Sequence, residues 1–422
     1  MRKLVALGAA FAAFILAFAF PGVSAPNIAG LWDAEIVADQ LGIPFRFEID
    51  QTGNQVQGFF FEGDRKIGST SGSFAGDHLR LEYDYLDTTL EIIFEGDQFL
   101  GSYRVNRPGA RPLAIRARRF VPAPTNAAAD APQVSGSWEM RRLPQEVKTP
   151  SDKQTWNLFL RQSGAEVSGS ILRVDGDTGF LTGRWQTGRL VLSHFAGQGP
   201  LLFEAKRNPD GTLLISLNRG ANYVAVRKSE ARAKGVPDPP DPTRYTSVKD
   251  PGVPFRFSFP DLTGKLISNG DARFKGKVVL LTIGGSWCPN CQDEAPFLAD
   301  LYKEFHAQGL EIVGLMFEAD EDPAVARPHV ATFIRRFAIP YPMLLAGTVD
   351  DISQKLPQLV NFGAYPTTIY LGRDGRVRSV HAGFASQATG EEYVRLKGEV
   401  RGLVQRLLAE NSQTGAAPSG GL

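Results

Sequence analysis

The sequence predicts a multidomain protein: two tandem antiparallel β-barrels or sandwiches, followed by an α/β domain. In the first half, two similar segments alternate apolar and polar residues with period two, as half-buried strands do. The last third has continuous apolar strands and amphipathic helices, which indicate a mixed sheet covered by helices. A proline-rich segment separates the two parts. The length of 422 residues allows about two to four domains.

The composition is that of a globular protein, with 43% hydrophobic and 22% charged residues. The formal net charge of +1 gives no basic field, so we expect no nucleic-acid partner. The five histidines show no metal-ligand spacing, and the only two cysteines form a single pair. We therefore expect neither a metal site nor a cofactor. The sequence leaves the oligomeric state open.

The N-terminus, residues 1–25, reads as an export signal or an N-terminal anchor. Arg2 and Lys3 form a positive start, and residues 4–20 contain no polar side chain. Small residues then offer a signal-peptidase site, and cleavage and retention as an anchor both stay open. In either case we expect the body of the protein to lie in an oxidising extracytoplasmic space, periplasmic or secreted.

The two β-rich segments are copies of one another. Gly30-Leu31-Trp32 pairs with Gly136-Ser137-Trp138, and further matches follow at one constant offset. They pair Gln51, Gly53, Val56, Gly58, Gly72, Phe74 and Leu79 with Gln162, Gly164, Val167, Gly169, Gly183, Trp185 and Leu190. The internal repeat predicts two similar units of about six to eight strands each. We expect Trp32, Trp138 and Trp185 to lie in their cores rather than to bind ligands.

The domain boundaries follow composition. We expect repeat 1 over 26–120, a Pro/Ala linker over 121–133 and repeat 2 over 134–229. A Pro-rich, semi-rigid linker follows over 230–248. The α/β domain is expected over 249–411, and a disordered tail over 412–422.

Within the α/β domain, a buried strand leads into a helix through the sequence "GGSWCPNCQDEAP". The strand is predicted over Lys277–Gly285, and the pattern from Asp293 to Gly309 is helical. Cys288 and Cys291 lie at the turn between them, where a helix N-terminus favours a thiolate. The spacing predicts a redox-active disulfide, with Cys288 as the exposed attacking thiol and Cys291 as the deeper, resolving thiol.

These residues resemble a known family. "WCPNC", followed by Glu294 and Pro296, then "YPTT" from Tyr365 and "GRDGRV", is similar to the TlpA/ResA-like extracytoplasmic branch of the thioredoxin superfamily. The resemblance implies a thioredoxin-like fold, a cis peptide before Pro366, and a proton-handling role for Glu294 beside Cys291. It implies that Trp287, Pro289, Tyr365 and Pro366 form the substrate-binding surface.

The resemblance implies a thiol-disulfide oxidoreductase that reduces extracytoplasmic protein or peptide disulfides, with electrons from a membrane-bound donor. A peroxiredoxin-type thiol peroxidase is an alternative of the same fold, although the Pro and Thr of its Pro-x-x-x-Thr-x-x-Cys loop are not in place before Cys288. A second alternative makes the β-rich repeats a binding module with an accessory redox domain, and a third makes them spacers. Gly284 and Gly285 replace an aromatic pair of many relatives, and we expect them to loosen the packing behind the turn.

Overall fold

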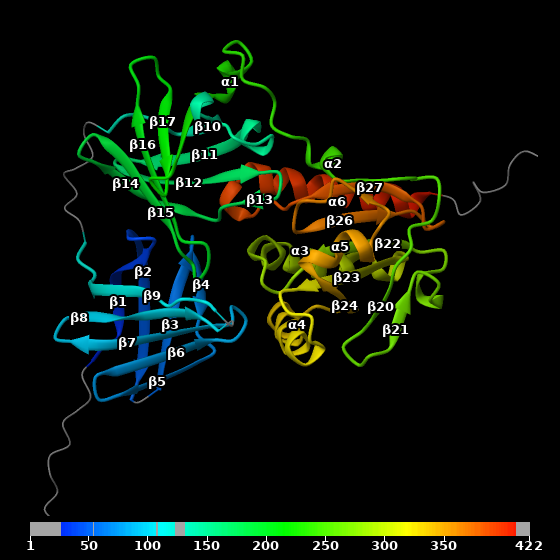
Figure 1. The fold of residues 1–422 in the computed structure, drawn as a ribbon, viewed down its shortest axis with the longest axis horizontal. Helices are drawn as coiled ribbons and strands as arrows, with labels where there is room; N and C mark the ends of the chain where they lie inside the picture. Colours follow the sequence, from blue (N-terminus) through cyan, green and yellow to red (C-terminus); the bar gives the residue numbers. More distant parts are fainter. Residues whose placement is uncertain (1–26, 54, 107–108, 123–130, 411–422) are drawn as a thin grey trace, which may run out of the picture.

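The computed structural model describes residues 27–53, 55–106, 109–122 and 131–410. The expected export signal and the tail after residue 410 lie outside the described residues, as does most of the first linker. Two β-barrels lie one above the other, and the α/β domain lies beside both of them (Figure 1). All three units therefore meet in one region.

The first barrel is a closed antiparallel ring. Its sheet has the order β2-β1-β9-β8-β7-β6-β5-β3-β4, and β2 also pairs with β3, which closes the ring. The short β4 pairs only with β3 and lies outside the ring. The strands are β1 (Gly30–Ala38), β2 (Leu41–Thr52), β3 (Gln55–Glu62), β4 (Arg65–Gly68), β5 (Ser71–Ala75), β6 (His78–Tyr83), β7 (Thr88–Glu95), β8 (Gln98–Val105) and β9 (Leu113–Arg119).

The second barrel repeats this topology strand for strand, with β11 paired to both β10 and β12 and with β13 outside the ring. Each sheet thus has nine strands, one more than the upper end of the prediction, because β4 and β13 are short extra hairpin arms. Ring closure excludes the sandwich alternative. The strands are β10 (Gly136–Arg142), β11 (Trp156–Ser163), β12 (Glu166–Arg173), β13 (Gly176–Asp177), β14 (Leu181–Gln186), β15 (Arg189–His194), β16 (Leu201–Arg207), β17 (Leu213–Leu217) and β18 (Ala221–Arg227).

The duplication extends to individual contacts in the barrel cores. The indole N–H of Trp32 donates to the carbonyl of Ile28 at 3.0 Å, and that of Trp138 donates to Val134 at 2.9 Å. An arginine guanidinium covers each indole ring, at 4.2 Å in the first barrel and 3.9 Å in the second. Trp32, Trp138 and Trp185 are all buried, so the prediction of core tryptophans is confirmed.

Two short helices interrupt the segment between the second barrel and the α/β domain, α1 (Lys228–Ala231) and α2 (Pro242–Tyr245). Residues 236–241 between them have no regular secondary structure. The second barrel itself contains two short 3-10 turns, Pro144–Glu146 and Ser151–Lys153.

The α/β domain is built on a five-stranded mixed sheet of order β24-β23-β22-β26-β27. β22, β23 and β24 are parallel, while β26 and β27 are antiparallel to their neighbours. The elements are β19 (Ser247–Val248), β20 (Ser258–Pro260), β21 (Leu266–Ser268), β22 (Val278–Gly284), α3 (Pro289–Phe305), β23 (Leu310–Glu318), α4 (Pro323–Phe337), β24 (Met343–Thr348), α5 (Ile352–Lys355), β25 (Leu359–Val360), β26 (Thr367–Leu371), β27 (Val377–Ala382) and α6 (Glu391–Ala409).

β22 is buried along its whole length, as its unbroken apolar sequence predicts. Its alternate residues enter two core clusters. Val278 and Leu280 pack with residues of α3, α4 and α6, whereas Val279 and Leu281 pack with the segment 255–274 and with Ile352 of α5. The sheet is thereby fixed from both faces, and the end of β22 that leads into α3 has a rigid support.

Candidate active site

The two cysteines lie where β22 passes through a tight turn into α3. Cys288 is the N-cap residue of α3 and forms a disulfide with Cys291 in the first helical turn. The backbone N–H of Cys291 points at the Cys288 sulfur at 3.2 Å. A free helix N–H and the helix dipole both favour negative charge at this sulfur, so the reduced form of Cys288 is placed to exist as a thiolate.

The prediction of an exposed Cys288 was wrong. Only 3% of Cys288 is exposed, against 5% of Cys291. The carbonyl oxygen of Tyr365 lies 3.6 Å from the Cys288 sulfur, and the rest of its surroundings form the wall of a cleft. Cys288 lines that cleft, whereas Cys291 lines a separate small cavity behind the turn. Cys288 therefore faces the cleft and Cys291 the cavity behind it, although neither residue is freely exposed.

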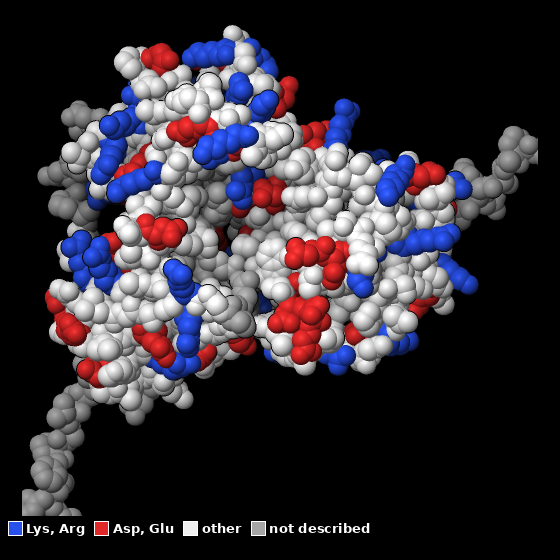
Figure 2. Space-filling model, in the orientation of Figure 1, with Lys and Arg blue, Asp and Glu red and all other residues white. Residues whose placement is uncertain are grey.

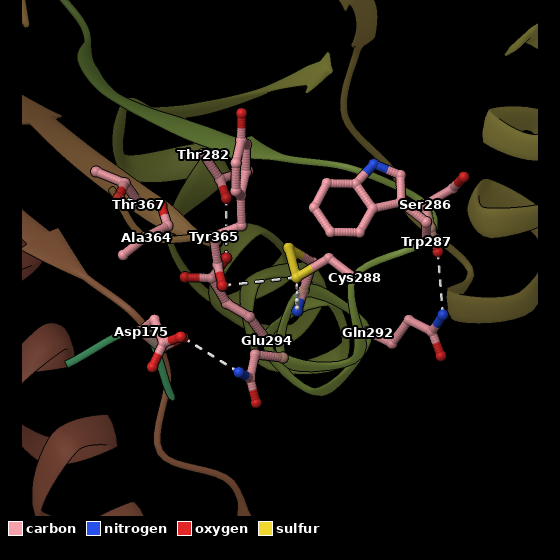
Figure 3. The surroundings of a disulfide bond; sticks show 12 residues. Asp175, Thr282, Ser286, Trp287, Cys288, Gln292, Glu294, Ala364, Tyr365 and Thr367 are labelled. Carbon is pink, nitrogen blue, oxygen red and sulfur yellow. Dashed lines mark hydrogen bonds between the residues drawn. A yellow bond between two sulfur atoms is a disulfide. The ribbon is translucent and has the colours of Figure 1, made fainter. Parts of the chain in front are cut away.

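Two of the residues expected to bind substrate, Trp287 and Tyr365, lie beside Cys288 (Figure 3). Trp287 and Tyr365 pack edge to face with ring centroids 5.3 Å apart, and Trp287, Pro289 and Tyr365 all line the cleft. The Tyr365–Pro366 peptide is cis, as the resemblance implies, and Pro366 itself is buried. The indole N–H of Trp287 donates to the Phe317 carbonyl at 2.9 Å, which fixes the ring.

Glu294 is buried beneath the turn and lines the same small cavity as Cys291. Its two carboxylate oxygens accept hydrogen bonds from the hydroxyls of Thr282 at 2.8 Å and Thr368 at 2.9 Å. Burial raises the pKa of Glu294 to about 7, and the two threonine hydroxyls partly oppose that rise. A carboxyl with this pKa can both accept and release a proton near neutral pH.

Sequence reasoning missed a second buried carboxyl that supports the turn. Glu318, at the end of β23, accepts hydrogen bonds from the Ser286 backbone N–H at 2.9 Å and from the Ser286 hydroxyl at 2.6 Å. The side chain of Gln292 donates to the Ser286 carbonyl at 3.0 Å. Burial raises the pKa of Glu318. A glutamate that ends a strand buried along its whole length was the available signal for this role.

The two glycines of the turn do not loosen it, contrary to the expectation from sequence. A Cβ atom at Gly284 would lie 3.2 Å from the Cys291 sulfur. At Gly285 it would collide with the Trp287 indole and lie 2.8 Å from the Phe317 carbonyl oxygen. Glycine is needed here because the disulfide and the indole pack directly against the backbone.

The cleft in front of Cys288 has a volume of about 490 Å³ and is lined by all three domains. The space-filling view is hollowed between the barrels and the α/β domain, and charges of both signs are interspersed around it (Figure 2). Glu62 of the first barrel and Asp293 of α3 lie in this lining, and burial raises the pKa of each to about 7. Among the described residues, no group of three His, Cys, Asp or Glu side chains could hold a metal ion.

Comparison with known proteins assigns the α/β domain to a family. The Redoxin family model matches residues 248–394. The thiol-disulfide oxidoreductase ResA of Bacillus anthracis is 30% identical over 139 residues, which are 33% of this chain and 73% of that protein. The chain belongs to the ResA-like thiol-disulfide oxidoreductases of the thioredoxin superfamily. ResA of Bacillus subtilis (strain 168) is 29% identical over 148 residues, which are 35% of this chain and 75% of that protein.

A solved thiol:disulfide interchange protein of the thioredoxin family, from Chlorobium tepidum TLS, is 24% identical. It covers 38% of this chain and 99% of its own length, with a TM-score of 0.30. The Redoxin match begins after both barrels, so the ResA-like part of the chain is its C-terminal domain. No helix within the described residues is both long and apolar enough to cross a bilayer.

Proposed function

We propose that this chain is an exported oxidoreductase that reduces protein or peptide disulfides by dithiol exchange through Cys288 and Cys291. The observation that carries the proposal is the disulfide at the N-terminus of α3, with Cys288 facing the cleft and Cys291 behind it. Trp287, Pro289, Tyr365 and Pro366 would bind the substrate around the Cys288 sulfur.

The exchange begins with the reduced protein. The Cys288 thiolate attacks one sulfur of the substrate disulfide, the substrate S–S bond breaks, and the first substrate sulfur leaves as a thiolate that takes a proton from solvent. Cys291 then gives its proton to the Glu294 carboxylate and attacks the Cys288 sulfur. The mixed disulfide breaks, the second substrate thiol leaves with a proton from solvent, and Glu294 returns its own proton to solvent. Two electrons have passed from the protein dithiol to the substrate.

Restoring the dithiol requires an external reductant, and we propose a membrane-bound dithiol donor. The positive start at Arg2 and Lys3 and the apolar run that follows support export, with the body of the protein in the periplasm or outside the cell. The proposed domains are 26–120, 134–229 and 249–411. Protease treatment would test the location, applied to intact cells and to cells whose outer layers are permeabilised while the cytoplasmic membrane stays closed. In the permeabilised cells the protease should cleave an exported body, whereas a cytoplasmic one would be protected.

The decisive experiment is disulfide reduction by the purified chain with dithiothreitol as electron donor. The Cys288→Ser variant should lose activity, whereas reduced Cys291→Ser, mixed with substrate after dithiothreitol is removed, should accumulate the mixed disulfide. Undiminished reduction by Cys288→Ser would refute the proposal, and full peroxide turnover by Cys291→Ser would favour the peroxidase alternative. The direction of electron flow follows from the reduction potential: about −270 mV or below indicates a reductase, and about −120 mV an oxidant.

A further inference from the structure

The second barrel packs directly on the dipeptide between the two cysteines. The side-chain amide of Asn290 donates to the backbone carbonyl of Asp175, in the turn between β12 and β13, at 3.1 Å. Gly176, the first residue of β13, has φ +123°, and a Cβ there would collide with the Asn290 side chain. The turn thus occupies space immediately beside the redox disulfide (Figure 3).

A buried polar anchor holds this turn in place. Asp177 of β13 accepts hydrogen bonds from both the backbone N–H and the hydroxyl of Ser386, in the loop before α6. It also accepts from Gly179 at 2.7 Å and from Ser170 at 3.2 Å, and only 5% of it is exposed. One residue of barrel 2 therefore ties its own turn to the ResA-like domain. Arg161 of β11 adds a hydrogen bond to the Ala388 carbonyl at 3.2 Å.

The first barrel closes the cleft from the other side. Arg65 of β4 pairs with Asp293 of α3 at 3.0 Å, and the guanidinium of Arg336 lies 4.3 Å from the ring centroid of Tyr85. The barrels are also joined to each other, since the Phe180 N–H donates to Glu62 at 2.7 Å. Strands β4 and β13, the two arms outside the rings, both belong to these contacts.

We propose that the two barrels form a fixed wall that restricts the active site to disulfides of low molecular weight, including short peptides, and excludes folded proteins. The proposal rests on the proposed function and narrows its substrate class. The cleft of about 490 Å³ lies within the roughly 300–1,000 Å³ of small-molecule sites. Only 3% of Cys288 is exposed, and residues of both barrels line the cleft in front of it, where they stand in the way of a disulfide on a folded surface.

A thiol-labelling experiment tests the wall without relying on enzymatic activity. In a Cys291→Ser chain, Cys288 is the only thiol, because the chain has two cysteines. Iodoacetamide should modify it readily, whereas a maleimide bearing a long polyethylene glycol chain should react at least about tenfold more slowly than a small maleimide. The difference should vanish in denaturant. Equal rates for the two maleimides in the folded chain would overturn the proposal.

A turnover experiment tests the substrate class. Pre-reduced protein should reduce bis(2-hydroxyethyl) disulfide and a short disulfide-linked peptide at least about tenfold faster than insulin. The double variant Arg161→Ala/Ser386→Ala weakens the docking of barrel 2 at residues that do not line the cleft. It should raise insulin reduction about fivefold or more and leave the small disulfides unchanged.

The matched control is Arg219→Ala, an exposed arginine of barrel 2 that pairs with Glu204 away from the cleft, and it should change neither rate. Equal reduction of insulin and the small disulfides by the wild type would overturn the restriction to small substrates, while leaving the proposed function intact. Loss of all reduction by the wild type would instead refute the proposed function. Unchanged insulin reduction in the double variant would show that barrel docking is not what excludes folded substrates.

Discussion

The hydroxyl of Thr368 donates a hydrogen bond to Glu294 at 2.9 Å, joining β26 to the first turns of α3. Thr282 of β22 donates to the other carboxylate oxygen at 2.8 Å. Burial favours the neutral acid at this position, while the two hydroxyls favour the carboxylate. The balance between these opposing effects sets the pKa of Glu294, and with it the pH at which Glu294 would take the proton of Cys291 in the proposed exchange.

Replacing Thr368 with valine should raise the pKa of Glu294 further above its usual range. The change keeps the shape of the side chain and removes one hydrogen bond to the charged form. Such a bond contributes about 1.5 kcal/mol, so the pKa should rise by about one unit. The pH profile of single-turnover disulfide reduction should move to higher pH by the same amount. Thr367→Val is the matched control, because Thr367 bonds to the Ala364 carbonyl instead. An unmoved profile would remove Glu294 from the proton transfer.

Glu294→Gln should make the oxidised protein more stable at high pH than the wild type. In the wild type, folding raises the pKa of the Glu294 carboxyl from 4.5 to about 7. Between these two pH values the folded state therefore binds more protons than the unfolded state. The contribution of Glu294 to stability is therefore complete below about pH 4.5 and falls as pH rises to about 7. Above pH 7 the loss is roughly 3 kcal/mol.

The measurement for Glu294→Gln is urea unfolding of oxidised protein at about pH 4.5 and about pH 8. The free energy of unfolding of the variant minus that of the wild type should be larger at the higher pH, whatever the absolute value of this difference. Glu304→Gln, an exposed residue of the same helix, should show no such trend. An advantage independent of pH would contradict the raised pKa.

The sequence was enough to locate the cysteine pair and the buried carboxyl beneath it. Cys288, Cys291 and Glu294 lie within one strand-turn-helix segment, and the resemblance supplied distant Pro366. It was not enough to find Thr282, which looks like any residue of a buried strand, or the contact of Asn290 with Asp175. That contact joins residues 115 positions apart, and "VDGD" reads only as a turn. The low exposure of Cys288 was not predicted either, since the Tyr365 carbonyl beside its sulfur comes from 77 positions further along the chain.

For the barrels, too, the sequence predicted the local features but not the closure of the sheet. Period-two alternation and the repeated Gly-x-Trp segments predicted strands and duplication. Whether β2 would return to pair with β3 depends on the twist and register of the whole sheet, so ring closure emerged only from the structure.

Asp177→Ala should destabilise the docked arrangement by about 3 kcal/mol or more, because it leaves the buried N–H of Ser386, the N–H of Gly179 and two hydroxyls without their acceptor. Calorimetry should show the unfolding of barrel 2 or of the ResA-like domain at a lower temperature. Asp210→Ala is the control, since Asp210 accepts from Thr212 in an exposed turn of the same barrel. Equal effects of the two substitutions would contradict an anchoring role for Asp177.

Gly285→Ala should destabilise the active-site turn, whereas Gly398→Ala in α6 should not. A Cβ at position 285 would meet the Trp287 indole and the Phe317 carbonyl, which lies in a buried strand and cannot move away. Overpacking of this kind costs about 1–3 kcal/mol. At Gly398 a Cβ meets nothing within 4 Å, and alanine in a helix interior stabilises by about 0.5–1 kcal/mol relative to glycine. Relative to the wild type, the denaturation midpoint of Gly285→Ala should therefore fall and that of Gly398→Ala should rise. Equal stability of Gly285→Ala and wild type would mean that the turn can yield, as the sequence alone suggested.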